Sequence, residues 1–489
     1  MRILMISAEY APFAKTGGLA DMVAGLAKTL VSAGHDVRVL IPHYVGLPAN
    51  VDGPGGLRLG GVQVSPVAVN GTHPGYSFSL ITDRSGTDPT LYVLDAPAFF
   101  SGGDIYTGSD LDARRFALLA HAALRLCKVL DWTPDILHCH DWHSALAPAL
   151  LATARQREPT VRQPATVLTI HNIGYQGIFE AELLPDLGLI DAGPVTELNF
   201  LRTGILAADA LTTVSPAHAT EILTPEYGMG LDGLLRERAD RLFGILNGVD
   251  YAAWNPASDG RLPAQFSSGN LDGRSICRTE LIRRSGLATG PHSVSRLPVL
   301  GMVSRLAAQK GLELAIGALP PLLREQRLQA VVLGQGEARY VAELQAMAAS
   351  FPGQFSFVDA QDESMARLVY AGADAFMVPS LYEPCGLTQL YALRYGAVPI
   401  VRETGGLKDT VRHFDTASLA GNGSVFKHAD VAGLAWAIGE ALNWYQQPEL
   451  WTRVQQHGMS ADFSWQHQAP RFEALYLQLI RSQQERTRQ

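Results

Sequence analysis

Two cations and a carboxylate in the second half of the chain have the types and spacing that phosphate and sugar chemistry needs. Arg305 and Lys310 follow an apolar, strand-like run at residues 299–303 and precede a helical pattern. An arginine fork and a lysine point charge can neutralise a diphosphate leaving group without a metal ion. The segment at residues 383–388 (EPCGLT) follows a second such run, at residues 374–378, and supplies a carboxylate and helix-start amides. As ordinary surface cations, Arg305 and Lys310 would carry no function.

Glycine pairs open two predicted helices and could bring backbone amides close to an anion. Residues 16–21 (TGGLAD) match residues 404–409 (TGGLKD), and each copy follows a strand-like run. Helix-start amides and the helix dipole favour negative charge there, and Lys15 adds a cation beside the first copy. Two tight structural turns are the alternative interpretation.

A third glycine-rich segment, Gly334-Gln335-Gly336, is weak evidence for nucleotide binding. It lacks the third glycine of the dinucleotide-binding fingerprint, and the phosphate-loop pattern of NTPases does not occur in the chain. An NAD enzyme or a phosphate-loop NTPase is therefore poorly supported. A structural turn explains the segment at least as well.

The segment at residues 138–143 (HCHDWH) has the composition of a metal site, but its spacing argues against one. Strand alternation places His138 and His140 on one face and Cys139 on the other. Core histidines with satisfied hydrogen bonds are the alternative for His138 and His140. No metal is expected.

The end of the same strand-like run is a better candidate for a ligand site. Residues 135–139 should form a strand that delivers Asp141 to the crevice where open α/β sheets bind ligands. His171 and Asn172 end the next strand-like run, at residues 165–171, in the same manner. These side chains are expected to meet at one edge of a sheet.

The elements that must position these groups alternate between strands and helices, which predicts a doubly wound α/β protein with two Rossmann-like lobes. The middle of the first half looks more hairpin-like. The expected strands lie near residues 2–7, 37–41, 62–69, 76–81, 91–95, 135–139, 165–171, 211–214, 299–303, 330–333, 355–358, 374–378 and 398–401. The expected helices include residues 20–33, 112–130, 337–350 and 466–484. Prolines and glycines between Asn247 and Arg296 interrupt this periodicity, so we place the domain junction there.

Composition excludes several classes of protein. With 489 residues, 47% hydrophobic and 18% charged, the chain can bury large cores and is not intrinsically disordered. The net charge of −8 and the lack of a basic run make nucleic acid an unexpected partner. Four scattered cysteines suit a reducing compartment. With no signal-like start and no uncharged stretch of about 18 residues, a cytoplasmic protein without a membrane partner is expected.

Six motifs together resemble those of bacterial glycogen synthases and plant starch synthases, in the family's order over residues 1 to about 465. They are KTGGLAD at 15–21, HCHDWH at 138–143, HN at 171–172, LNGVD at 246–250, SRL with QKG at 304–311, and EPCGLT at 383–388. The resemblance implies the GT-B fold, in which two Rossmann-like lobes face a central cleft. The lobes would be residues 1–250 plus 465–489, on the acceptor side, and residues 251–464, on the nucleotide-sugar side.

The resemblance also implies an activity and roles for single residues. Glucose would pass from ADP-glucose to the non-reducing-end 4-hydroxyl of glycogen or a maltooligosaccharide, with retention and without a metal or cofactor. Arg305 and Lys310 would bind the distal phosphate, and Glu383 would hold sugar hydroxyls. With His171, these three form the expected catalytic set. The expected substrate-binding residues are Lys15, Gly17, Gly18, Asp21, Asp141, Asn172, Asn247, Cys385, Gly386, Leu387 and Thr388.

Two departures from the family pattern leave alternatives open. Many retaining relatives have a second glutamate eight positions after the first, where this chain has Tyr391. Close relatives often place an aromatic residue where this chain has Gln361, so UDP-glucose remains an alternative donor. A phosphorylase would need a pyridoxal-phosphate lysine segment that is not recognisable here. A non-catalytic glucan-binding protein would not need Lys15, Arg305, Lys310 and Glu383 together.

Overall fold

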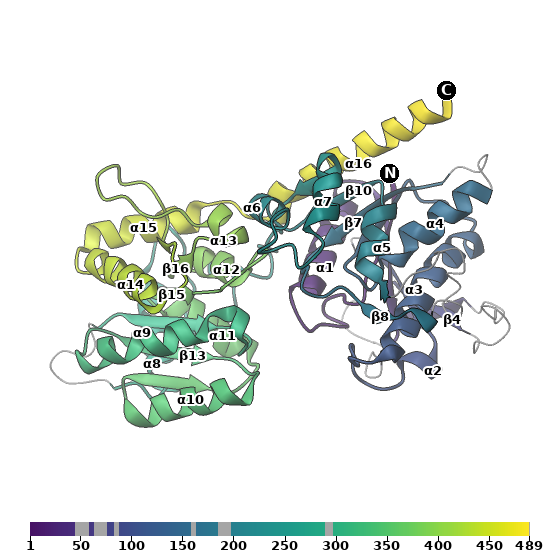
Figure 1. Cartoon of the computed structure of the whole chain (residues 1–489). Helices are drawn as coiled ribbons and strands as arrows, with labels where there is room; N and C mark the ends of the chain where they lie inside the picture. Colours follow the sequence, from purple (N-terminus) through teal and green to yellow (C-terminus); the bar gives the residue numbers. More distant parts are fainter. Residues whose placement is uncertain are drawn as a thin grey trace. The chain divides into compact units, whose positions relative to one another are not determined.

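A computed structural model of the protein describes residues 1–44, 58–62, 76–82, 88–157, 163–183, 197–288 and 297–488. The chain forms two compact units, Met1–Gly248 with Trp465–Gln489, and Val249–Ser464. In Figure 1 the first unit runs from purple to teal and includes the yellow C-terminal helix, α16 (Trp465–Arg488).

The first unit is built on one large, mainly parallel sheet. Its strands are β1 (Arg2–Ile6), β2 (Asp36–Pro42), β3 (Arg58–Val62), β4 (Ser77–Thr82), β5 (Thr90–Asp95), β6 (Ile136–His140), β7 (Ala165–Ile170), β10 (Ala210–Thr213) and β11 (Leu242–Gly244). Within the described residues their order is β11-β10-β7-β6-β1-β2-β5-β4-β3. Pairing is parallel from β11 to β5, whereas β5-β4-β3 is antiparallel, which confirms the hairpin-like middle. A small antiparallel pair joins β8 (Ile178–Glu180) and β9 (Glu197–Asn199).

Helices cover both faces of this sheet. They are α1 (Gly18–Ser32), α2 (Pro97–Phe100), α3 (Asp110–Val129), α4 (Leu146–Arg157), α5 (Phe200–Ala207), α6 (Pro216–Glu221), α7 (Asp232–Glu237) and α16. Alternation along β1 sends Leu4 and Ile6 into a core shared with α3, and Ile3 and Met5 into a core shared with α1 and α16. Burial on both faces explains why β1 is apolar from Ile3 to Ile6 instead of alternating with polar residues.

The second unit repeats this plan with a smaller, wholly parallel sheet. Its strands are β12 (Val299–Val303), β13 (Gln329–Leu333), β14 (Phe355–Val358), β15 (Ala375–Val378), β16 (Val398–Arg402) and β17 (Ser424–Phe426). Their order is β14-β13-β12-β15-β16-β17 among the described residues, so the order reverses between β12 and β15. Helices α8 (Asp272–Arg284), α11 (Glu363–Gly372) and α12 (Thr388–Arg394) share one core with the sheet. Helices α9 (Leu312–Arg324), α10 (Ala338–Ser350) and α14 (Val431–Tyr445) share the other, and α13 (Gly405–Thr410) and α15 (Pro448–Ser460) complete the unit.

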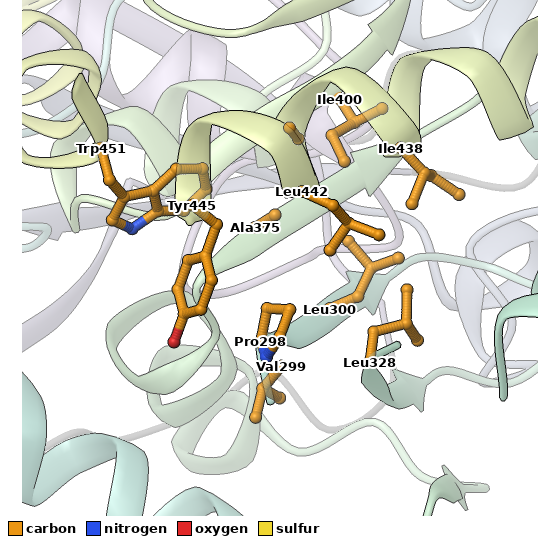
Figure 2. A pocket seen from close by; sticks show the side chains of 11 residues that line it. Pro298, Val299, Leu300, Leu328, Ala375, Ile400, Ile438, Leu442, Tyr445 and Trp451 are labelled. Carbon is orange, nitrogen blue, oxygen red and sulfur yellow. The ribbon is translucent and has the colours of Figure 1, made fainter. Parts of the chain in front are cut away.

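A small cavity lies in the core of the second unit, between its sheet and helices α14 and α15 (Figure 2). Leu300, Ala375 and Ile400 from the strands face Leu442 and Trp451 from the helices across it. Its volume of about 10 Å³ leaves room for one water molecule at most, and its lining is apolar. This packing gap cannot hold a sugar or a nucleotide, so functional groups have to be sought at the strand ends.

The predicted alternation of strands and helices is confirmed, with most boundaries shifted by no more than two residues. The strand expected near residues 62–69 falls at residues 63–69 outside the described ranges. The sequence pattern missed α8 inside the junction segment, because its buried positions include Arg274 and only a short apolar stripe. It also missed β17, which has three residues. No described helix combines the length and apolar character that crossing a bilayer requires.

Candidate active site

Asp141 comes directly after β6 and holds the loop that follows β7. Its φ of +56° lies in the left-handed region, which a residue other than glycine rarely adopts. Its Oδ1 accepts hydrogen bonds from the backbone N–H groups of His171 (2.7 Å) and Asn172 (3.4 Å). Burial raises the pKa of Asp141 to about 7, although these backbone donors oppose the shift. The structure thus brings these three residues together at the carboxyl edge of the sheet.

His171 is joined to a second histidine of the sheet. Its Nε2 lies 3.1 Å from Nδ1 of His140, whose side chain is fully buried. Burial lowers the pKa of His171 to about 3 and that of His140 well below its ordinary value. Both rings are therefore neutral near pH 7, so His171 could offer a ligand a hydrogen bond but no charge.

His138 is a core residue with both ring nitrogens in hydrogen bonds, as one of the two interpretations predicted. Nε2 lies 2.6 Å from Oγ1 of Thr169, and Nδ1 lies 2.7 Å from the hydroxyl of Tyr476 on α16. Cys139 packs into the opposite core. No group of three or more His, Cys, Asp or Glu side chains in the described ranges is arranged to hold a metal ion. His140 differs from His138, because its Nε2 has no hydrogen-bond partner among the described residues.

The first glycine pair precedes and begins α1, but one of its amides is already used within the chain. The N–H of Gly17 donates to Oε2 of Glu9 at 3.1 Å. In the structure this amide is bonded to a carboxylate of the chain, and its predicted contact with a phosphate stays a prediction. Lys15 pairs with Asp21 at 2.8 Å and keeps 47% of its side chain exposed. Ligand contacts of Lys15, Gly18 and Asp21 therefore remain predictions.

Asn247 lies at the end of the first unit and is 5% exposed. Its side-chain oxygen has no hydrogen-bond partner among the described residues. A buried amide oxygen without a partner costs free energy unless a ligand or a solvent molecule satisfies it. Asn247 thus keeps the predicted capacity to bind a substrate hydroxyl.

Lys310 and Glu383 form an ion pair beside the carboxyl ends of β12 and β15 in the second unit. Nζ of Lys310 lies 2.6 Å from Oε2 of Glu383, which also accepts a hydrogen bond from Oγ of Ser380 at 2.8 Å. Only 18% of the Lys310 side chain and 9% of the Glu383 side chain are exposed. Such a pair loses much of its solvation, and further hydrogen bonds must offset that cost. Sugar hydroxyls on Oε1 and phosphate oxygens on the two other ammonium protons could supply them.

The backbone around Lys310 is tied to the loop that carries Glu383. Gly311 has a φ of +68°, and a Cβ atom there would lie 2.0 Å from the carbonyl oxygen of Pro379. The carbonyl oxygen of Gln309 accepts a hydrogen bond from the N–H of Leu381 at 2.8 Å. Its side-chain NH₂ group donates to the carbonyl oxygen of Tyr382 at 3.1 Å. These close contacts hold the lysine at a fixed distance from its carboxylate partner.

Arg305 is exposed, and close backbone packing fixes the loop that presents it. Cβ atoms on Gly334 and Gly336 would lie 1.9 and 2.3 Å from the carbonyl oxygens of Ser304 and Leu306. The Gly334-Gln335-Gly336 segment is therefore a structural turn that packs on the Arg305 loop. Within the described residues, Arg305 makes no ion pair, so its guanidinium can meet an anionic ligand.

The substrate-binding residues predicted after Glu383 form the entry to α12. Gly386 has a φ of +72°, Leu387 caps the helix, and Thr388 is its first residue. Cys385 is 4% exposed, and its carbonyl oxygen accepts a hydrogen bond from the side chain of Gln389 at 3.0 Å. The structure thus places these four residues and Glu383 in one continuous loop.

The second glycine pair serves packing. The N–H of Gly406 donates to the carbonyl oxygen of Glu383 at 3.0 Å, and a Cβ there would lie 2.1 Å from the carbonyl oxygen of Cys385. The amide of Gly406 is therefore used inside the chain, which favours a tight structural turn over an anion-binding turn. The alternative, a tight structural turn, describes it, and its glycine lets α13 approach the Glu383 loop.

Comparisons with known proteins cover nearly the whole chain. Residues 2–237 match the family model of the starch synthase catalytic domain, and residues 291–456 match that of glycosyl transferases group 1. Glycogen synthase 2 of Geobacter sulfurreducens is 40% identical over 97% of this chain and 98% of its own length. Glycogen synthase 1 of Methylococcus capsulatus is 41% identical over 98% and 97%. The chain belongs to the glycogen and starch synthase family. It is a glycosyltransferase of the glycogen synthase type.

Solved structures place this synthase in the GT-B fold. The catalytic domain of starch synthase IV from Arabidopsis thaliana, bound to ADP and acarbose, superposes with a TM-score of 0.87 and 33% identity, over 98% of this chain and 99% of that one. Sucrose-phosphate synthase from Thermosynechococcus elongatus shares the fold, with a TM-score of 0.61 and 17% identity, over 98% and 99%. The predicted GT-B architecture, with two Rossmann-like domains, is confirmed.

Tyr391, the first departure of this synthase from the family pattern, is a core residue. It is 8% exposed and stacks on Trp254 with ring centroids 3.9 Å apart and an interplanar angle of 15°. Tyr370 packs edge-on against it. A carboxylate at this position would be desolvated among aromatic rings, so the tyrosine suits the surrounding core.

Glu9 and Ser380 are synthase residues that the sequence patterns did not single out. Glu9 had a positional signal, since it closely follows the first strand, at the carboxyl edge where ligands bind. Ser380 had none. Its hydroxyl matters only because the fold of the following loop returns Glu383 to within 2.8 Å.

Replacing Cys385 by serine should leave kcat and KM within about threefold of the wild-type values. The residue adds its backbone to the loop, and the Gln389 bond is made to its carbonyl oxygen, which serine also has. Steady-state kinetics with a nucleotide sugar and glycogen measure this. Loss of activity by a folded variant would mean that the thiol itself takes part in the reaction.

Proposed function

We propose that this glycosyltransferase is a glycogen synthase that transfers glucose from ADP-glucose to the 4-hydroxyl at the non-reducing end of an α-1,4-glucan, with retention of configuration. The observation that carries the proposal is the Lys310–Glu383–Ser380 cluster, where a cation and a carboxylate meet at a strand edge. Phosphate and hexose are the two groups that a nucleotide sugar presents side by side. The ADP and acarbose bound to the Arabidopsis relative support this substrate pair.

The two units would divide the work. Arg305 and Lys310 of the second unit neutralise the diphosphate, and the helix-start amides of α12 add further donors. The first unit offers neutral hydrogen-bonding groups in His171 and Asn247, which suit the hydroxyls of glucose and of the acceptor. Accordingly, residues 251–464 form the nucleotide-sugar lobe, and residues 1–250 with 465–489 form the acceptor lobe.

The chain supplies no carboxylate nucleophile eight residues after Glu383, because Tyr391 occupies that position in a core. A same-face displacement through an oxocarbenium-like state would instead let the departing phosphate take the proton of the acceptor hydroxyl. Lys310 then acts on the leaving group, where negative charge grows as the glycosidic bond breaks. We also propose a cytoplasmic location, which the four free cysteines support.

An assay of the purified protein with glycogen and either ADP-glucose or UDP-glucose tests the proposal. We expect incorporation of glucose into glycogen and a higher kcat/KM with ADP-glucose. Gln361, exposed before the N-terminal cap of α11, provides no aromatic ring for adenine, so UDP-glucose is the alternative donor. Glycogen binding without release of ADP would favour the glucan-binding protein instead.

Activity should be unchanged by EDTA. The leaving diphosphate is neutralised by Arg305, Lys310 and helix-start amides, so a divalent cation has no assigned role. Initial rates with and without the chelator, and with added Mg²⁺, measure this directly. A strict requirement for Mg²⁺ would contradict the assignment of the cations.

A further inference from the structure

Glu9 is a buried carboxylate with an unusually complete set of hydrogen bonds. It lies three residues after β1 and is 3% exposed. Oε2 accepts from the backbone N–H groups of Thr16 (2.7 Å) and Gly17 (3.1 Å). Oε1 accepts from the hydroxyls of Thr16 (2.6 Å) and Tyr106 (2.5 Å). These four donors use all of the acceptor positions that an ionised carboxylate offers.

No cation shares in this arrangement. Across the described ranges, no basic side chain forms an ion pair with Glu9, so the four donors stabilise its charge. Two of the donors are backbone amides directly before α1, a helix of 15 residues whose N-terminal end favours negative charge. The carboxylate therefore lies just before the start of α1, where the helix dipole favours its negative charge.

The same carboxylate connects two segments that are far apart in the sequence. One is the turn at residues 15–18, which presents Lys15. The other carries Tyr106, whose ring stacks on His143 with centroids 4.8 Å apart and an interplanar angle of 23°. Burial and then the charge of Glu9 raise the pKa of Tyr106 well above its ordinary value, so the phenol keeps the proton that it donates.

We infer that Glu9 is a positioning residue, an internal anion that holds the Lys15 turn and Tyr106 in the arrangement that glucosyl transfer uses. The kinetic part of this inference rests on the proposed function. It assigns the backbone amide of Gly17 to an internal carboxylate of the chain. Glutamine cannot replace Glu9, because its NH₂ group would face two of the four donors.

Chemical rescue of Glu9→Ala tests the inference. Loss of the carboxylate should lower kcat/KM for ADP-glucose by about 10- to 100-fold, because the Lys15 turn and Tyr106 lose their shared acceptor. Formate is small enough to occupy the vacated carboxylate position and should restore part of the activity, whereas the neutral isostere formamide should not. Glu9→Gln should be impaired as well, without response to formate.

Asp209→Ala is the matched control. Asp209 is also a mostly buried carboxylate of the first unit that accepts from a backbone N–H and a hydroxyl, both of Thr166, but it lies at the amino edge of the sheet. Its loss should lower Tm and leave kcat/KM unresponsive to formate. Rescue of Asp209→Ala to the same extent, or wild-type kinetics in Glu9→Gln, would overturn the positioning role.

A second readout does not depend on the reaction. Formate should raise the Tm of Glu9→Ala and leave that of the wild type unchanged, because only the variant has an unoccupied anion position. If the wild type shows no transfer from ADP-glucose, the proposed function fails while this stability test still decides the role of Glu9. Should Glu9→Ala not fold, Glu9→Gln and Glu9→Asp provide the comparison. Wild-type kinetics and stability in both would refute the inference.

Discussion

Replacing Lys310 by glutamine should lower kcat by roughly 100- to 1000-fold, the largest effect on activity expected from this structure. The ammonium group lies 2.6 Å from Glu383 and keeps two further protons for a ligand. Negative charge on the leaving diphosphate grows as the glycosidic bond breaks, and a neutral amide matches that charge poorly. Because the lost interaction is strongest in the transition state, kcat should fall more than the affinity for glucan does. Steady-state kinetics with ADP-glucose and glycogen measure both.

Two further variants separate charge stabilisation from a folding defect. Lys310→Gln leaves Glu383 nearly buried without its cation, which can destabilise the loop. The double variant Lys310→Gln with Glu383→Gln removes that unpaired charge and should recover Tm without recovering kcat.

Lys427→Gln, which changes the charge of a lysine that is 78% exposed, should behave as the wild type. If kcat of Lys310→Gln or of Arg305→Gln stays within about twofold of the wild type, that cation does not stabilise the leaving group and the proposed site fails.

Much of the site could be predicted because the chemistry lies at strand ends that the sequence marks clearly. Asp141 and His171 each follow a strand-like run, and parallel strands deliver such residues to the same edge of a sheet. The Lys310–Glu383 pair follows from the same rule, since β12 and β15 are neighbours at the point where the strand order reverses. Runs of apolar residues thus predicted both the fold and the residues brought together.

The glycine pairs show where this reasoning reached its limit. Local sequence indicates that a helix begins at Gly18 or Gly405, but it does not reveal what lies against the amides. In the first unit a buried glutamate fills that place, and in the second the carbonyl oxygen of Glu383 does. Both partners are set by tertiary packing between segments, and a pattern of seven residues contains no information about it.

Tyr391 and its neighbours illustrate a further dependence on tertiary structure. Trp254, which stacks on Tyr391, comes from the junction segment that the sequence predicted to be irregular. The guanidinium of Arg367 lies over the same indole, 3.8 Å from its centroid, and only 5% of that side chain is exposed. It donates to Oδ2 of Asp259 at 2.8 Å and to the carbonyl oxygen of Ala253 at 2.7 Å. One buried cation therefore holds the junction segment on α11.

Replacing Arg367 by methionine should lower the free energy of unfolding by about 3–5 kcal/mol. The variant keeps an apolar side chain of similar length but leaves Asp259, whose side chain is 4% exposed, with Tyr395 as its main side-chain donor. Arg261→Met is the matched control, because Arg261 is 56% exposed and pairs with Glu363 at the surface. Its effect should stay within about 1 kcal/mol. Denaturant unfolding of both variants measures the difference, and equal losses would show that burial of the Arg367 pair is not what stabilises the junction.

The pH dependence of unfolding gives an independent check on the same pair. Burial alone would raise the pKa of Asp259, but hydrogen bonds from Tyr395 and Arg367 outweigh burial and lower it below its ordinary value of 3.8. A carboxyl whose pKa is lower in the folded state stabilises the protein above its unfolded pKa, and that contribution is lost as the pH falls through the folded pKa. The wild type should therefore lose this stabilisation only in strong acid, below the ordinary range of an aspartate. In Arg367→Met the folded pKa of Asp259 should rise toward or above the unfolded value, so this acid-dependent loss should shrink or reverse. An unchanged acid limb in the variant would mean that Tyr395 alone holds the charge of Asp259, and the large loss of stability expected for Arg367→Met would then need another cause.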